Sequence, residues 1–349
     1  MKTKYLLLAV LGLTAWGCAQ ENTPSTGETA REYLTLWMDK YHPGVAANTD
    51  GLYILEDKPG TGDLWDSEMD YSYVEVTVKT LGGTISSTSD ETLSKQLGTY
   101  VKGNYYGPRY QAIGKGYSYA GFDALLSGMR VGGQRQAVVP AWMLTTSRYN
   151  TQQEYIDAAT VASSLVYDVK FCGQTEDVSE TEKDSLATYV TRRFGNIASV
   201  NYKSTEDDPQ DPDGTFYFVS STAGFTDDDA RGDTSTGTIN YTGRLLNGQV
   251  FDTTIEKVAK DAGIYDASKT YSPQKVTFAT AWDSIALGES TSLIDGFKGG
   301  LFLMKYVGQK AVVIFTSTHG YTTTGKGDSI PAWSPLQFEL ELVSIDKNE

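Results

Sequence analysis

Two predicted strands around Asn247-Gly248 carry the side chains best suited to chemistry. The first strand contains Tyr241, and the second ends on Phe251 followed by Asp252. An Asn-Gly pair favours a tight hairpin because both residues tolerate positive φ. Two aromatic rings and a carboxylate could line a mostly apolar pocket with one charge at its edge. This set contains no nucleophile.

Other kinds of catalytic or metal site find little support. The chain has two histidines, His42 and His319, and no G-x-S-x-G, so a serine hydrolase is not expected. The acidic stretch 206–214 fails the EF-hand pattern, because a glycine at loop position 6 puts Pro209 at position 1 and Ser220 at position 12. There is no P-loop. We therefore expect neither a metal nor a cofactor.

The run from Thr238 to Thr253 resembles the V-H-Y-T-G-x-L-x-D-G-x-x-F-D-S segment of the FKBP-type peptidyl-prolyl isomerases. Four later segments follow in the family's order. Residues 293–301 resemble V-I-x-G-W-x-x-G-L, and residues 304–311 resemble M-x-V-G-E-K-A. Residues 314–321 resemble the strand that leads to the A-Y-G tyrosine, and residues 330–342 resemble I-P followed by L-x-F-x-V-E-L. In the last segment Leu336, Phe338, Leu340 and Leu342 alternate onto one face of a strand.

The resemblance implies an isomerase whose pocket holds a proline ring. Tyr241, Asp252 and Tyr321 would act on the substrate: Asp252 orients the rotating carbonyl, and the Tyr321 hydroxyl and the Ile294 N–H hold substrate carbonyls. The walls would be formed by Phe251, Val276, Leu293, Ile294, Phe297, Ile330 and Phe338. Val276 is assigned because the strand 275–278 replaces the family's P-F-x-F. The family's usual His and Trp are Asn240 and Phe297 here.

The N-terminus has the pattern of an export signal. Lys2 and Lys4 precede an apolar run too short to span a bilayer, which ends in Ala15-Trp16-Gly17-Cys18. Small residues before a cysteine resemble a bacterial lipoprotein cleavage site, so we expect Cys18 to be lipidated and to anchor the chain to a membrane. An incidental cysteine after an ordinary signal peptide is the alternative. Ala19 in place of Asp favours the outer membrane, facing the periplasm or the cell surface.

The net charge and the second cysteine argue against nucleic-acid binding and against an internal disulfide. The net charge is −15 for the full chain, and removal of Lys2 and Lys4 leaves 27 basic against 44 acidic residues. Such a chain is repelled by nucleic acid. Cys172 has no partner for a disulfide once Cys18 is lipidated, and it is expected to be a small buried residue.

An internal repeat organises the rest of the chain. Helical patterns at 29–40 (Ala30, Tyr33, Leu34 and Trp37 on one face) and 179–194 (with a Ser179/Glu182 capping box) each precede FKBP-like segments. We expect an α+β fold of two tandem FKBP-like domains, each an antiparallel half-barrel sheet around a short helix. The predicted divisions are signal peptide 1–17, tether 18–28, a degenerate domain 29–176, helix and linker 177–234, and the isomerase domain 235–349.

The first copy is expected to keep the scaffold and lose the pocket. Where the second has Tyr241 the first is expected to have Val78, and Ile85-Ser86 is expected to correspond to Phe251-Asp252. Relative to the FKBP pattern, the second copy has two apparent insertions, 254–273 and 279–291, which could form a flap that recognises clients or could cover the pocket.

The sequence therefore predicts a prolyl isomerase that assists folding of exported, proline-containing polypeptides. Two alternatives stay open: a non-catalytic chaperone or peptide-binding protein, and a surface protein that binds a glycan or a partner protein through exposed Tyr and Trp. The sequence does not indicate the oligomeric state.

Overall fold

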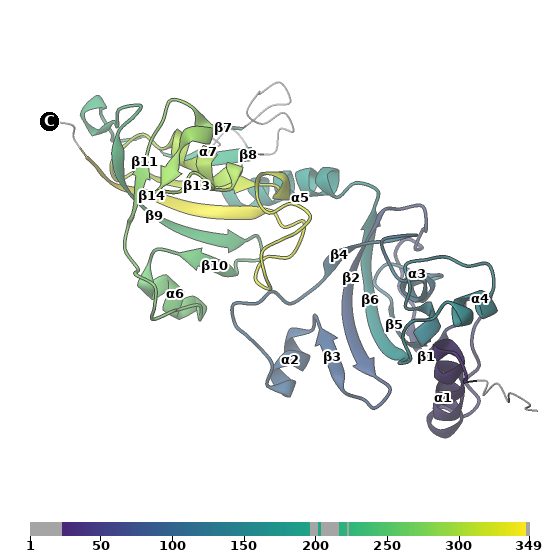
Figure 1. Ribbon diagram of the computed structural model, residues 1–349. Helices are drawn as coiled ribbons and strands as arrows, with labels where there is room; N and C mark the ends of the chain where they lie inside the picture. Colours follow the sequence, from purple (N-terminus) through teal and green to yellow (C-terminus); the bar gives the residue numbers. More distant parts are fainter. Residues whose placement is uncertain (1–22, 196–201, 204–215, 222, 347–349) are drawn as a thin grey trace, which may run out of the picture.

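The chain folds into two units that lie end to end, each built on an antiparallel sheet (Figure 1). The computed structural model describes residues 23–195, 202–203, 216–221 and 223–346. The predicted signal peptide, Cys18 and the acidic stretch 206–214 lie outside these residues. No helix in the described part of the chain is long and apolar enough to cross a bilayer.

The first sheet has the strand order β1-β5-β6-β2-β3, with β4 also paired to β2. Its strands are β1 (Tyr53–Lys58), β2 (Tyr71–Thr80), β3 (Ile85–Thr88), β4 (Arg109–Ala112), β5 (Gln134–Val139) and β6 (Leu165–Thr175). Its helices are α1 (Thr26–Tyr41), α2 (Glu91–Leu97), α3 (Ala120–Leu126), α4 (Gln152–Asp157) and the 3₁₀ helix η1 (Ala141–Met143).

The second sheet has the order β12-β11-β9-β14-β13-β8-β7, with β10 also paired to β9. Its strands are β7 (Tyr202–Lys203), β8 (Phe216–Ser220), β9 (Thr236–Leu245), β10 (Val250–Thr253), β11 (Gln274–Thr277), β12 (Ala286–Leu287), β13 (Lys310–Phe315) and β14 (Leu336–Ile345). Its helices are α5 (Val178–Phe194), α6 (Glu256–Ala262), α7 (Asp295–Leu303) and the 3₁₀ helices η3 (Asp227–Asp229), η4 (Trp282–Ser284) and η5 (Ser317–His319).

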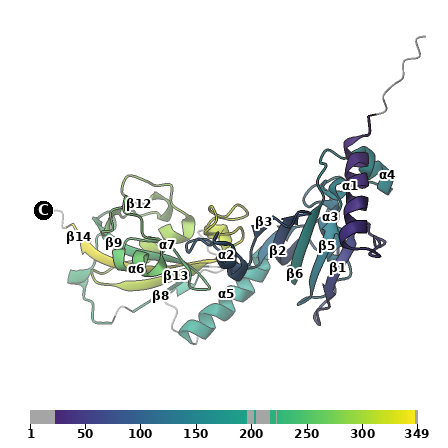
Figure 2. The ribbon, with the colours of Figure 1, turned by 90° about the horizontal axis from the view of Figure 1, so that it is seen from below.

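Helix α1 covers the outer side of the first unit, away from the second (Figure 2). It begins at Thr26, inside the predicted tether, because the Ser25 side chain accepts a hydrogen bond from the Glu28 N–H. Its buried face consists of Ala30, Leu34 and Met38, spaced by four residues, whereas Tyr33, which we predicted on this face, is 57% exposed.

Helix α5 connects the two units (Figure 2). The Asp177 side chain caps it by accepting hydrogen bonds from the Ser179 and Glu180 N–H groups, so the predicted capping box is wrong. Leu186 and Val190 face the second sheet and form a small core with Tyr217 and Ile314.

The two sheets are repeats of each other at the level of hydrogen bonds. Both long strand pairs carry one irregularity, at Cys172 in β6 opposite β2 and at Val343 in β14 opposite β9. When the two registers are compared, each strand residue in 71–112 is equivalent to the residue 165 positions later, in 236–277. The threonine hydroxyls of Thr77 and Thr88 lie 2.7 Å apart, and those of Thr242 and Thr253, at equivalent positions, lie 2.9 Å apart.

The register corrects two of the predicted equivalences. Tyr241 corresponds to Val76 rather than Val78, and Phe251-Asp252 corresponds to Ser86-Ser87 rather than Ile85-Ser86. The bulges at Ser86 and Phe251 lie at equivalent positions, so the offset of 165 residues holds through them, whereas matching short motifs missed it by one or two residues.

The segment after Asp252 is not an insertion peculiar to the second unit. We call residues 89–108 the first flap and residues 254–273 the second flap; each contains a short helix that ends at a glycine with positive φ, Gly98 or Gly263. Each flap also holds a stacked tyrosine pair, with ring centroids 5.3 Å apart for Tyr100/Tyr106 and 5.4 Å apart for Tyr265/Tyr271. By contrast, the segment 279–291, with η4 and β12, has no counterpart in the shorter β4–α3 connection of the first unit.

The first flap also makes the contacts between the units. The Lys102 ammonium donates to the Asp261 carbonyl (2.8 Å), Gln249 donates to the Gly103 carbonyl (2.9 Å), and the Tyr105 N–H donates to the Asp328 carbonyl (2.8 Å). The first flap therefore holds both the second flap and the loop 320–335 of the second unit.

Candidate functional site

The β9–β10 hairpin brings the first three predicted site residues together. Gly248 in the turn has φ +93°, as the Asn-Gly signal predicts. Neighbouring side chains of a regular strand point to opposite faces, yet Phe251 and Asp252 line the same cavity. A bulge at Phe251, between the pairings of Val250 and Asp252, explains this arrangement.

Tyr241 and Asp252 form the polar edge of the cavity. The Tyr241 hydroxyl donates to the Asp252 carboxylate (Oδ2, 3.0 Å), and the Lys269 ammonium lies 3.6 Å from the other oxygen. Burial, and then the negative charge of Asp252, raises the pKa of Tyr241 well above its ordinary value. Its phenol therefore stays protonated at neutral pH and keeps donating, which fixes the orientation of the carboxylate.

Aromatic rings form the floor and walls. Phe297 packs edge-on against Tyr241 (centroids 5.2 Å apart) and lies 4.8 Å from Phe338, which in turn meets Phe251 edge-on at 5.6 Å. Phe297 lies near the start of α7, and the adjacent Gly296 lets this helix lie directly on the ring of Phe315, where a Cβ would clash. The result is an apolar surface built from packed aromatic rings.

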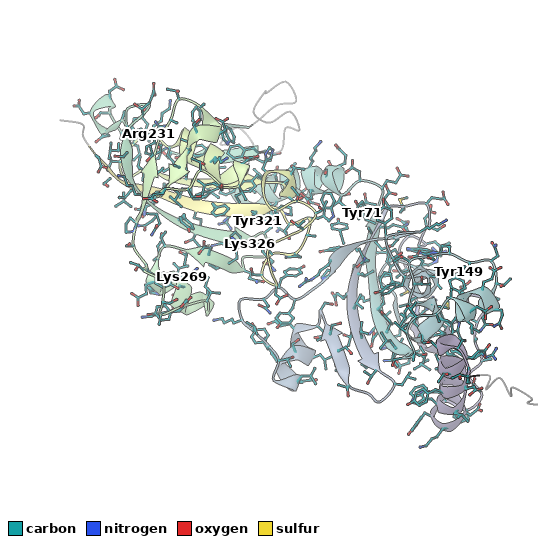
Figure 3. The ribbon with its side chains drawn as sticks, in the orientation of Figure 1. Tyr71, Tyr149, Arg231, Lys269, Tyr321 and Lys326 are labelled. Carbon is teal, nitrogen blue, oxygen red and sulfur yellow. The ribbon has the colours of Figure 1, made fainter. Side chains whose placement is uncertain are left out.

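The loop 320–335 supplies the remaining wall. Tyr321 lines the cavity, and its hydroxyl oxygen accepts a hydrogen bond from the Lys326 ammonium (3.1 Å). A lysine ammonium only donates, so the phenol hydrogen of Tyr321 remains available for a carbonyl oxygen in the cavity. Figure 3 shows Tyr321 and Lys326 close together in the second unit.

Ile294 offers a second donor. It lies immediately before α7, and its carbonyl accepts from the Phe297 and Lys298 N–H groups. Among the described residues no group accepts from the Ile294 N–H, as is usual where a helix begins without a side-chain cap. A bound carbonyl could take this place.

The cavity has a volume of about 390 Å³ and gathers nine of the ten residues predicted for the site. These are Tyr241, Asp252, Tyr321, Phe251, Leu293, Ile294, Phe297, Ile330 and Phe338. The segments predicted as insertions line the cavity rather than fill it: the second flap contributes Lys269, and 279–291 contributes Leu287.

Val276 is the exception, and its assignment is wrong. It lies in β11 between β9 and β12, fully buried in the core of the second unit. Leu287 of β12 lines the cavity instead, because the segment after Phe278 leaves the sheet and returns to pair with Val276. β12 spans two residues, too few for a periodic pattern, so no local sequence pattern predicts Leu287 as a lining residue.

Sequence reasoning also missed Lys269 and Lys326, which both line the cavity. Each reaches a predicted site residue from a loop, and loops carry no periodicity that would predict a side-chain contact. In the part of the chain that the structure describes, no group of three or more His, Cys, Asp or Glu side chains is placed to hold a metal ion.

The first unit lacks this constellation at the equivalent positions. Val76, Ser86 and Ser87 stand where the second unit has Tyr241, Phe251 and Asp252, while Phe122 and Tyr167 match Phe297 and Phe338. The first unit thus lacks the three side chains that form the polar edge and one wall of the cavity in the second unit.

Comparisons with known proteins identify the family of the chain. The family model described as FKBP-type peptidyl-prolyl cis-trans isomerase matches residues 279–343. The chain is 32% identical over 109 residues to FK506-binding protein 1A of Aspergillus fumigatus, covering 31% of this chain and 76% of that protein. The chain belongs to the FKBP-type peptidyl-prolyl cis-trans isomerase family.

Other relatives are matched over a smaller share of their length. FK506-binding protein 2 of Dictyostelium discoideum is 31% identical over 109 residues (31% of this chain, 63% of that protein). The macrophage infectivity potentiator of Trypanosoma cruzi is 31% identical over 107 residues (31% of this chain, 41% of that protein). The chain thus spans less than two thirds of either of these relatives.

Solved structures show weaker likenesses. A peptidyl-prolyl cis-trans isomerase from Pseudomonas syringae matches at 21% identity and a TM-score of 0.31, covering 48% of this chain and 96% of that one. The three FKBP domains of wheat FKBP73 match at 16% identity and a TM-score of 0.28, covering 86% of this chain and 97% of that one.

Proposed function

We propose that the second unit is a peptidyl-prolyl cis-trans isomerase. The observation that carries this proposal is the cavity itself: four aromatic rings, a carboxylate held by Tyr241 and Lys269, and two donors from Tyr321 and Ile294. A proline ring fits against the rings, and the donors suit the carbonyls on either side of an X-Pro bond.

The chemistry needs no nucleophile. Rotation about an X-Pro amide has a barrier of about 18–20 kcal/mol, because the C–N bond has double-bond character. The twisted amide loses that resonance and becomes less polar, so a pocket that excludes water favours it over the planar ground state. Asp252, held at the edge with fixed orientation, would act electrostatically on the rotating carbonyl.

The test is cis–trans exchange of a short X-Pro peptide, measured by NMR with the chain from residue 19 onward. We expect acceleration that is lost in Asp252→Val and retained in Ser87→Val, the matched change at the equivalent position of the first unit. A folded protein that binds the peptide without accelerating exchange would contradict the isomerase proposal and leave a non-catalytic peptide-binding protein.

We also propose that the protein acts on exported polypeptides as an outer-membrane lipoprotein, facing the periplasm or the cell surface. Support comes from the sequence alone: the short apolar run before Cys18 and the small residues at its end. Metabolic labelling with a fatty acid tests it. The native chain should be labelled and should fractionate with membranes, and Cys18→Ser should be unlabelled and released; equal labelling of both contradicts the anchor.

A further inference from the structure

Two lysines flank the polar edge of the cavity in a chain that is otherwise strongly acidic. The whole chain carries a net charge of −15, yet the ionic side chains that line the cavity are Lys269, Lys326 and Asp252. Since Lys269 faces Asp252 at 3.6 Å, the two largely offset one another, which leaves the positive charge of Lys326 at the mouth.

The backbone at each lysine is fixed by local hydrogen bonds. Lys326 pairs with Ile330 in a short antiparallel bridge, with N–O distances of 2.7 and 3.3 Å. The preceding Gly325 has φ +64° and lies so close to this bridge that a Cβ would clash with it. Lys269 donates its N–H to the Asp266 carbonyl, and the Asp266 N–H donates to the Tyr271 hydroxyl within the second flap. The backbone that carries each lysine at the cavity edge is therefore held in place, and the ammonium groups contact Asp252 and Tyr321 there.

The first unit shows that Lys269 is not required for the fold of a flap. The stacked tyrosines and the lysine over the first ring are kept in both flaps: Lys95 lies 4.7 Å from Tyr100, and Lys260 lies 4.8 Å from Tyr265. The residue equivalent to Lys269 is Asn104. The first unit thus lacks both this lysine and the carboxylate equivalent to Asp252. The presence of Lys269 therefore correlates with the pocket residues and not with the fold of the flap.

We infer that Lys326 and Lys269 select X-Pro segments with an acidic side chain within one or two residues of the proline. The inference rests on the proposed isomerase activity and names its substrate class. A carboxylate beside the proline would meet an ammonium group at the mouth, and a lysine there would be repelled. Each exposed pair is expected to contribute roughly two- to five-fold in kcat/KM, and salt should weaken it.

The experiment compares peptides that differ only in Glu, Gln or Lys on either side of the proline. The readouts are kcat/KM by NMR exchange and Kd by titration. The native chain should favour Glu over Gln and Gln over Lys. In the double variant Lys269→Gln/Lys326→Gln the Glu-to-Gln ratio should fall to one or below, because Asp252 is then the ionic side chain left in the cavity. Lys326→Glu should favour the Lys peptide. Lys257→Gln on α6, whose side chain is 84% exposed, is the matched control and should keep the native ratio.

The outcomes separate the two proposals. Equal Glu-to-Gln ratios in the native chain and the double variant overturn the selectivity, even if every peptide is isomerised. If no peptide is isomerised but Kd keeps the Glu preference and loses it in the double variant, the selectivity holds and the isomerase proposal is wrong. Thermal unfolding of each variant shows that the ratios compare folded proteins.

Discussion

Val76 and Tyr241 occupy the same position in the two sheets and make the same backbone contacts. The Val76 N–H donates to the Ser89 hydroxyl (2.8 Å), and the Tyr241 N–H donates to the Thr254 hydroxyl (2.9 Å). The Ser89 and Thr254 N–H groups in turn donate to the Val76 and Tyr241 carbonyls, each at 3.0 Å. At this position the two units therefore differ in the side chain, while the backbone hydrogen bonds around it are the same.

The hydrogen bond from Tyr241 to Asp252 can be tested by removing a single oxygen. Tyr241→Phe keeps the ring against Phe297 but frees the carboxylate. We therefore expect kcat/KM for a Gln-Pro peptide to fall roughly ten- to a hundred-fold, in line with the 1.5–3 kcal/mol of a hydrogen bond to a charged group. The peptide Kd should change less than kcat, because the aromatic surface remains. A matched loss of kcat in Tyr189→Phe, which removes a hydroxyl bonded to Gln337 outside the cavity, would contradict a specific role for Tyr241.

Gly243 allows the ring of Phe251 to lie across β9. A Cβ at this position would lie 2.5 Å from the Phe251 ring and 2.9 Å from the Phe338 ring. We expect Gly243→Ala to displace Phe251, to lower the free energy of unfolding by about 1–3 kcal/mol as other overpacked cores do, and to abolish peptide binding. Chemical denaturation and peptide titration measure the two effects.

The first unit supplies the control for this change. Val78 stands at the position of Gly243, and the bulged residue of the facing strand is Ser86 instead of Phe251. The double variant Gly243→Ala/Phe251→Ser should therefore regain most of the stability lost in Gly243→Ala while peptide binding stays absent. If Phe251→Ser brings back no stability, the clash is not the cause.

Trp333 connects the cavity loop to the first unit. Its ring meets Tyr71 edge-on with centroids 5.6 Å apart, and its backbone adopts φ +58°, which is unfavourable for a side chain of this size. Figure 3 shows Tyr71 on the part of the first unit that faces the second. We expect Trp333→Ala to speed amide hydrogen exchange across 321–335 and to lower kcat/KM, because Tyr321 and Lys326 lie on this loop.

A double-mutant cycle with Tyr71→Ala isolates the contact. The coupling energy should be about 0.5–1.5 kcal/mol, the range measured for aromatic pairs. Additive effects of the two single changes would show that the units do not support one another through these rings.

Local sequence patterns predicted the residues of the site, but they did not predict the contacts between distant segments. The Asn247-Gly248 turn and the alternation of Leu336 to Leu342 each reflect backbone geometry within a few residues. The site residues on these strands, among them Tyr241, Asp252 and Phe338, line the cavity as predicted. The assignment of Val276 was wrong because it depended on the path of the chain after residue 279. The packing of Trp282 and the pairing of β12 with β11 determine that path. The predicted equivalences between the two copies were wrong by one or two residues, because they too depend on how strands distant in the sequence pair.

Helix ends show the same limit. Ser179 and Glu182 match the capping-box pattern, but Asp177 caps α5, and the Glu182 side chain is buried instead. The Glu182 carboxylate accepts a hydrogen bond from the buried N–H of Ser317, 135 residues later. The sequence cannot indicate such a contact, since it arises only when α5 packs against the second sheet.

Burial of Glu182 gives the protein a pH-dependent stability. The side chain is 3% exposed, and this burial raises the pKa of its carboxyl, against the opposing effect of the Ser317 N–H. A carboxyl whose pKa is higher in the folded chain than in the unfolded chain stabilises the fold while it is protonated. Its contribution is complete below the unfolded pKa of about 4.5 and is lost as the pH rises through the higher folded pKa.

Glu182→Gln should remove this dependence, because glutamine cannot ionise but still offers an oxygen to the Ser317 N–H. We expect the variant to match the native chain near pH 4 and to become more stable than it as the pH rises to 7, measured by urea denaturation across that range. Glu180→Gln, two residues earlier on the exposed face of α5, should show no such divergence. A native chain that gains stability relative to Glu182→Gln with rising pH would show that the buried carboxylate is stabilised in its charged form by Ser317.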